Sequence, residues 1–126
     1  MPILDVEIVG EQAGDAPLDG LADRIATDVG AALGTPAGQL WVTVRHLPAS
    51  HYAENGPPIA TLPVFVRVLA RAQGSSDASS WPQRAASIAA AVSQATARER
   101  SSVHVIFEPD ASGRVFFGGV PDPRAR

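Results

Sequence analysis

The sequence predicts an α+β fold in which two tandem βαβ units form a four-stranded mixed sheet with two helices on one face. Three observations lead to this prediction. Apolar residues alternate in four short segments, two longer segments carry apolar stripes at three- and four-residue steps, and the two halves of the chain resemble each other. A helix-length crossover between two strands implies a right-handed connection and a parallel pair. Two such pairs side by side complete the sheet.

The internal repeat is visible in short matching segments. Met1-Pro2-Ile3-Leu4 matches Leu62-Pro63-Val64-Phe65, and Trp41-Val42 matches His104-Val105. The spacing between matching positions is nearly constant, so the duplicated piece is a complete βαβ unit.

We expect one domain over residues 1–126, with a first βαβ unit at 2–56 and a second at 63–120. Gly56-Pro57-Pro58 lies between them and is typical of a break in regular structure.

In the first half, residues 3–9 are expected to form a strand, because apolar and acidic residues alternate there. Asp15 is expected to cap a helix whose apolar stripe runs from Leu18 to Leu33, and Gly34 is expected to end it. A second alternating strand follows from Leu40.

In the second half, alternation from Val64 to Arg71 predicts the third strand. A polar loop at 74–80 precedes a helix whose apolar stripe begins at Trp81, and the fourth strand is expected around 103–108.

One face of the predicted sheet is rich in valine and suits a core, whereas the other mixes charged and apolar residues. That second face carries Asp5, Glu7, Trp41, Thr43, Arg45, Phe65, Arg67, Leu69, Arg71, His104 and Ile106. A face of this character predicts contact with another subunit. A solvated sheet face with scattered apolar residues is the alternative.

Composition narrows the class of protein. With 45% hydrophobic and 18% charged residues, the 126-residue chain is typical of a globular domain. We expect no signal peptide and no membrane segment, and the absence of cysteine fits a cytoplasmic protein. The net charge of −3, with arginines spread along the chain, argues against a nucleic-acid partner.

Pro2 is the candidate for chemistry. Removal of Met1 leaves a secondary amine at the start of an apolar strand, and burial there lowers the pKa of an amine. All ten basic residues are arginine and there is no cysteine, so no lysine amine or thiol competes for base or nucleophile chemistry. The alternative is that Pro2 merely follows the initiator methionine.

Pro2 at the start of a strand, the duplicated βαβ unit and glycine-rich unit ends together resemble the tautomerase superfamily. Its members include 4-oxalocrotonate tautomerase and macrophage migration inhibitory factor. The segment 50–56, ending in Asn55-Gly56, is similar to the part of 4-oxalocrotonate tautomerase that supplies an aromatic wall and ends in Gly-Gly. Leu40–Val44 and Arg114–Gly119 are similar to parts of the cis-chloroacrylic acid dehalogenase branch.

The resemblance implies a homotrimer of double-βαβ subunits, with sites lined by neighbouring chains and no metal or organic cofactor. It implies that Pro2 is the catalytic acid/base and that Arg71 binds the carboxylate of a small substrate. An ion pair of Arg71 with Asp5 or Glu7 is the alternative. Tyr52 matches the aromatic wall, and His104 stands where the inhibitory-factor branch has a tyrosine. Trp41 replaces a family arginine on the second strand. We expect these last three residues to contact substrate, or else to lie in subunit contacts.

Two other departures bear on the reaction. Gln12 stands where single-unit relatives carry a carboxylate-binding arginine, and Glu54 matches the water-activating acid of the dehalogenases without their helix histidine. The expected function is therefore an isomerase that tautomerises a small α-keto or enol carboxylic acid. A proline-dependent dehalogenase, hydratase or decarboxylase is one alternative, and a non-catalytic trimeric binding protein is another.

Overall fold

The structure is a computed structural model that describes residues 2–71 and 80–121. The elements are, in order, β1 (Ile3–Val9), α1 (Leu21–Leu33), β2 (Trp41–Leu47), a 3-10 turn (Ala49–His51), β3 (Val64–Leu69), α2 (Trp81–Thr96), a second 3-10 turn (Arg100–Ser102), β4 (Val103–Phe107), β5 (Phe116–Phe117) and β6 (Val120–Pro121). The predicted order of strand, helix, strand in each half is confirmed, and β1 has the predicted bounds.

The main sheet has the strand order β2-β1-β3-β4, and a short β5–β6 hairpin follows it. β1 is parallel to β2, β3 is parallel to β4, and the central pair β1–β3 is antiparallel. The sheet is therefore mixed, as predicted. We call the end of the sheet at which β1 begins and β3 terminates the Pro2 end, and the opposite end the Tyr52 end.

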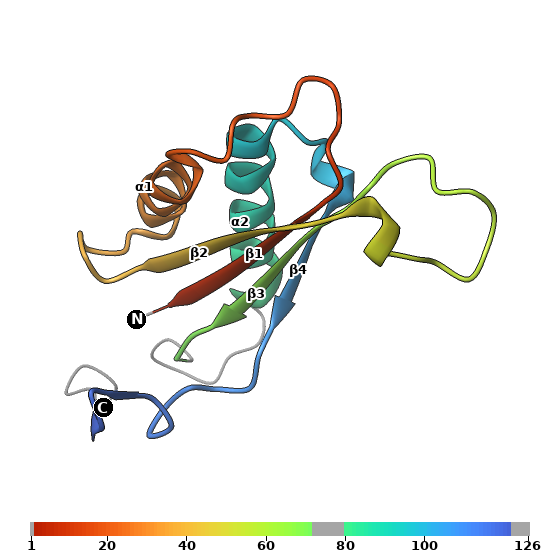
Figure 1. The fold of residues 1–126 in the computed structure, drawn as a ribbon. Helices are drawn as coiled ribbons and strands as arrows, with labels where there is room; N and C mark the ends of the chain where they lie inside the picture. The colour runs from red at the N-terminus through yellow and green to blue at the C-terminus, as the bar shows by residue number, and fades with distance from the viewer. Residues whose placement is uncertain (1, 72–79, 122–126) are drawn as a thin grey trace.

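Both helices lie on one face of the sheet (Figure 1). The core forms between them and the valine-rich face, because alternate strand residues point to that side. Its fully buried side chains include Leu4, Val6, Ile25, Val29, Val64, Val66, Ile88 and Val92. The predicted valine-rich core is confirmed.

The start of the first helix differs from the prediction. α1 begins at Leu21 behind Gly20, whose φ of 79° is the left-handed conformation that favours glycine. Asp15 does not cap it, because the Asp15 carboxylate accepts hydrogen bonds from Arg98 and from the backbone N–H of Gln12 instead. Leu18, which precedes the helix, is consequently 49% exposed.

The opposite sheet face carries the predicted mixture of charged and apolar side chains. Arg45 donates to Asp5 at 2.7 Å, and Arg67 lies 3.9 Å from Glu108. Most of the predicted loop at 74–80 lies outside the described residues. Within residues 2–71 and 80–121, no helix is long and apolar enough to cross a membrane.

Candidate active site

Pro2 lies at the tip of a central strand, and it is buried. Its carbonyl accepts a hydrogen bond of 3.1 Å from the backbone N–H of Trp41, which ties the tip of β1 to the start of β2. Its counterpart in the repeat, Pro63, is also buried, but the nitrogen of Pro63 is an internal amide without a basic lone pair. The geometry therefore offers one position per chain for a proline amine.

Trp41 is beside Pro2 and packs against the C-terminal hairpin. Its ring centroid lies 4.7 Å from that of Phe117, with an edge-to-face angle of 64°. We call Trp41 and Phe117 the aromatic pair. The packing of Phe117 on Trp41 was not predicted, because a contact between residues so far apart in the chain has no signature in local periodicity.

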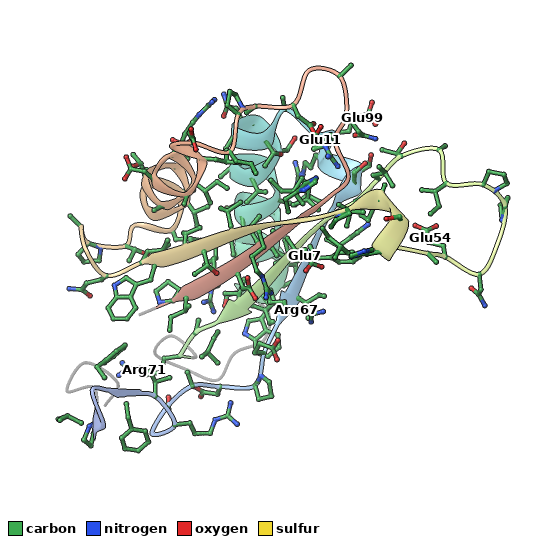
Figure 2. The ribbon with its side chains drawn as sticks, viewed as in Figure 1. Glu7, Glu11, Glu54, Arg67, Arg71 and Glu99 are labelled. Carbon is green, nitrogen blue, oxygen red and sulfur yellow. The ribbon has the colours of Figure 1, made fainter. Side chains whose placement is uncertain are left out.

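Arg71 lies two residues beyond the end of β3. Leu69 pairs with Ile3, so the chain brings Arg71 to the Pro2 end. Figure 2 shows the Arg71 side chain between the end of β3 and the C-terminal hairpin. Asp5, one of the two sheet carboxylates considered as a partner for Arg71, forms an ion pair with Arg45.

Tyr52 and His104 lie at the other end of the sheet. The Tyr52 ring is 6.0 Å from the ring of Phe65, which is 5.6 Å from that of His104. Phe65 pairs with Glu7, five residues along β1 from Pro2. At about 3.3 Å per residue that is a separation of roughly 17 Å. Figure 2 shows Glu54 and Arg71 at opposite ends of the sheet, and Glu54 is hydrogen-bonded to Tyr52.

A single chain therefore places three of the five predicted site residues, Pro2, Trp41 and Arg71, at the same end of the sheet. Arg71 lines a small hollow there with residues of α2 and of the segment after β4, among them Arg84, Glu108 and Asp110. Tyr52 and His104 form a separate group on the same sheet. Both groups can meet in one site only if a second copy of the chain supplies one of them.

Tyr52 and Glu54 form a short hydrogen bond. The Tyr52 hydroxyl donates to Glu54 Oε2 at 2.6 Å. The hydrogen bond to this carboxylate raises the pKa of Tyr52 above its ordinary value of 10.0. Tyr52 is therefore a protonated hydrogen-bond donor at neutral pH.

Arg98 lies at the Tyr52 end, just after the end of α2. Its side chain is 2% exposed, and all five of its N–H groups are used. Two bonds of 2.7 and 2.8 Å reach the Asp15 carboxylate, and three more reach the carbonyls of Val9, Gly10 and Leu62. This charge-assisted pair lowers the pKa of Asp15 below its ordinary value. The role of Arg98 was not predicted, because its charged neighbours Glu99 and Arg100 indicate only an exposed segment.

A cavity of about 270 Å³ also lies at this second end, lined in part by Gln12, Asp15, Leu18 and His46. It is not the candidate site, because Pro2 lies at the opposite end of the sheet and the Asp15 carboxylate is already paired with Arg98. Among the described residues, no three His, Asp or Glu side chains gather as a metal site requires.

Comparison of the sequence with protein-family models and with curated proteins gives no match. Solved structures are similar in fold. A structure described as the wild-type symmetric trimer of fused 4-OT has a TM-score of 0.72 and 15% identity, with 98% of this chain and 97% of that chain covered.

Two further structures of similar fold carry other names. A macrophage migration inhibitory factor-like protein from Entamoeba histolytica has a TM-score of 0.61 and 9% identity over 92% of this chain and 95% of that chain. The FG41 malonate semialdehyde decarboxylase inhibited by 3-bromopropiolate has a TM-score of 0.66 and 14% identity, covering 92% and 88%. The chain thus has the double-βαβ fold of the fused 4-OT structures, as its sequence predicts.

Proposed function

We propose that this chain is a cofactor-independent tautomerase that interconverts the keto and enol forms of a small carboxylic acid. The observation that carries the proposal is the buried position of Pro2 at the tip of β1. The fold supports it, because the similar structures include fused 4-OT.

Once Met1 is removed, the Pro2 nitrogen is a secondary amine of a buried residue. Burial disfavours the charged form, so the pKa of this amine falls below the roughly 7.7–8.0 of an ordinary α-amino group. A neutral amine takes a proton from the enol hydroxyl or from the carbon next to the carbonyl. It then returns that proton to a different atom, so the reaction needs no other reagent.

Arg71 holds the substrate carboxylate in this proposal. A guanidinium presents parallel N–H donors that match a carboxylate, and its positive charge also disfavours protonation of the nearby amine. Arg71 therefore orients the substrate and keeps Pro2 neutral.

A homotrimer completes the site. Tyr52 and His104 lie too far from Pro2 to share its substrate within one chain, and a neighbouring copy would supply both residues. The trimers among the similar fused 4-OT structures support this assembly.

The test is turnover of phenylenolpyruvate by protein whose N-terminus mass spectrometry identifies as Pro2. Pro2→Ala should lower the rate at least ~100-fold, the lower range of general acid–base effects. Pro63→Ala is the matched control, because it replaces the corresponding buried proline of the repeat and does not change the N-terminal amine. Equal rates for Pro2→Ala and the parent protein would remove Pro2 from the mechanism.

One observation favours a second candidate, a proline-dependent lyase. The Tyr52 hydroxyl fixes the carboxylate of Glu54, a group type that can act as a general base toward water, and a decarboxylase is among the similar structures. Turnover of malonate semialdehyde or of a 3-haloacrylate, faster than that of phenylenolpyruvate, would favour this function. A correctly processed trimer that turns over none of these substrates would be a binding protein.

A further inference from the structure

A long connection joins the two βαβ units at the Tyr52 end of the sheet. Residues 48–62, which we call the linker, lie between β2 and β3 and carry Tyr52 and Glu54. Figure 1 shows the linker as a loop that projects from this end of the sheet. Connections as long as this are uncommon in compact domains and are usually functional. How firmly the two ends of the linker are held decides where Tyr52 and Glu54 lie.

Gly10 lies between the two ends of the linker. Its N–H donates to the carbonyl of Leu47, the residue before the linker, at 2.7 Å. A Cβ atom at this position would collide with Cδ1 of Leu62 and would lie 3.3 Å from Cβ of Ala49. The φ of Gly10 is 64°, a conformation that favours glycine. The close approach of both linker ends therefore requires glycine here.

Arg98 ties the last residue of the linker to the end of β1. Its Nη1 donates to the carbonyls of Leu62 at 3.0 Å and Val9 at 3.1 Å, and its Nη2 donates to that of Gly10 at 2.8 Å. Two further bonds reach the Asp15 carboxylate, which balances the charge. A planar guanidinium can bind these carbonyls and the carboxylate together, whereas a lysine ammonium has three donors on one nitrogen.

We propose that Gly10 and Arg98 form a clamp on both ends of the linker, and that the clamp positions Tyr52. This inference rests on the proposed function, in which Tyr52 of one chain contacts the substrate bound at Pro2 of another. Arg98 touches no substrate and acts through the linker, so it is a positioning residue. A displacement of about 1 Å in an active-site group can cost about 100-fold in rate. A loosened linker would therefore lower turnover although Pro2 itself is unchanged.

Proteolysis of the folded protein tests the clamp separately from catalysis. Tyr52 is the only tyrosine in the chain, so the mass of a chymotrypsin fragment that ends there identifies the cut. Arg98→Lys keeps a positive charge beside Asp15 but loses carbonyl partners, so it should speed this cleavage at least about tenfold. Arg100→Lys is the matched control, because it changes a nearby exposed arginine, and it should leave the cleavage rate unchanged.

A pair of glycine variants tests the clamp with Arg98 in place. Gly10→Ala adds a Cβ that collides with Leu62, whereas Gly14→Ala, at a φ of 89°, meets no atom within 4 Å. Both substitutions strain the backbone, but only Gly10→Ala should speed cleavage after Tyr52. Leu62→Ala should restore part of the protection in Gly10→Ala, because it removes the colliding atom.

Turnover of phenylenolpyruvate by the processed protein tests the positioning role. Arg98→Lys should lower kcat/KM about 10- to 100-fold, with the pKa of the Pro2 amine unchanged in a ¹⁵N titration. In a Tyr52→Ala background the same substitution should have little further effect, because the clamp acts through Tyr52. A loss of global stability alone would not depend on Tyr52 in this way.

Unchanged cleavage after Tyr52 in folded Arg98→Lys, or equal cleavage of Gly10→Ala and Gly14→Ala, would overturn the clamp. Faster cleavage with unchanged kcat/KM, or an equal loss from Arg98→Lys with and without Tyr52, would overturn its positioning role. A parent protein without turnover, combined with faster cleavage in the clamp variants and not in their controls, would contradict the proposed function and leave the clamp in place.

Discussion

Two ion pairs of equal length in this chain have different surroundings. Arg45–Asp5 and Arg98–Asp15 are both 2.7 Å apart. The Arg45 side chain is 63% exposed, whereas that of Arg98 is 2% exposed. Exposed pairs contribute little because water screens them, while breaking a buried pair leaves a charge or several carbonyls without a partner.

Arg98→Ala should therefore lower the free energy of unfolding by about 3–5 kcal/mol. Arg45→Ala, the matched control, should cost no more than about 1 kcal/mol. Urea unfolding followed by circular dichroism measures both. Similar losses for the two variants would show that burial does not decide the strength of these pairs.

The Asp15 carboxylate makes stability depend on pH. Its pKa in the folded protein is lowered from the ordinary value of 3.8, chiefly by the hydrogen bonds from Arg98. A lowered folded-state pKa gives stability that is present above the unfolded-state pKa and is lost as pH falls through the folded-state pKa. The loss should therefore begin near the ordinary value and continue below it.

Asp15→Asn removes this titration, so its stability should fall less steeply than that of the parent protein as the pH drops below about 4. Urea midpoints at a series of acidic pH values measure the difference. Parallel pH profiles for the two proteins would contradict a role for the Asp15 carboxylate in acid stability.

At the scale of elements, the two helices end in the same backbone conformation with different residues. Gly34 ends α1 with φ 66°, whereas Ala97 ends α2 with φ 61°. The left-handed conformation is strained for alanine and free for glycine. The second helix therefore carries strain that the first avoids.

Ala97→Gly should raise the free energy of unfolding by about 0.5–1 kcal/mol, because it relieves this strain. Ala90→Gly, at an exposed position inside α2, should lower it by a similar amount. Thermal unfolding of both variants distinguishes the two positions. A loss of stability in Ala97→Gly would mean that its backbone is not strained.

The periodicity of apolar residues predicted the elements whose burial follows the local sequence pattern. The bounds of β1 were predicted correctly, because its alternation continues from Ile3 to Val9 without a break. The predicted start of α1 was wrong, because the Asp15 carboxylate binds Arg98, a residue far along the chain, and does not cap the helix. The residues around Asp15 do not indicate that a distant arginine binds its carboxylate.

At the scale of the whole molecule, the predicted site residues divide between two ends of one sheet. The repeat and the resemblance indicated Pro2, Trp41 and Arg71, and the fold brings these three to one end. Neither the repeat nor the resemblance predicts that Phe117 packs on Trp41, because that contact depends on how the C-terminal hairpin packs against the sheet.

The proposed homotrimer uses the mixed sheet face, where Ile106 is half-buried beside Arg67. Light scattering should give a mass three times the chain's 13.1 kDa. Ile106→Glu should lower that mass, because it adds charge to an apolar contact, whereas Leu18→Glu should not. A folded parent monomer, or an Ile106→Glu variant that remains trimeric, would contradict this use of the face.

The central claim is that Pro2 acts as a neutral amine in the processed chain. ¹⁵N NMR titration of protein labelled at proline measures the pKa of that amine directly. Burial and the nearby Arg71 guanidinium predict a pKa below the roughly 7.7–8.0 of an ordinary α-amino group. An amine that remains protonated beyond about pH 9 would contradict the account.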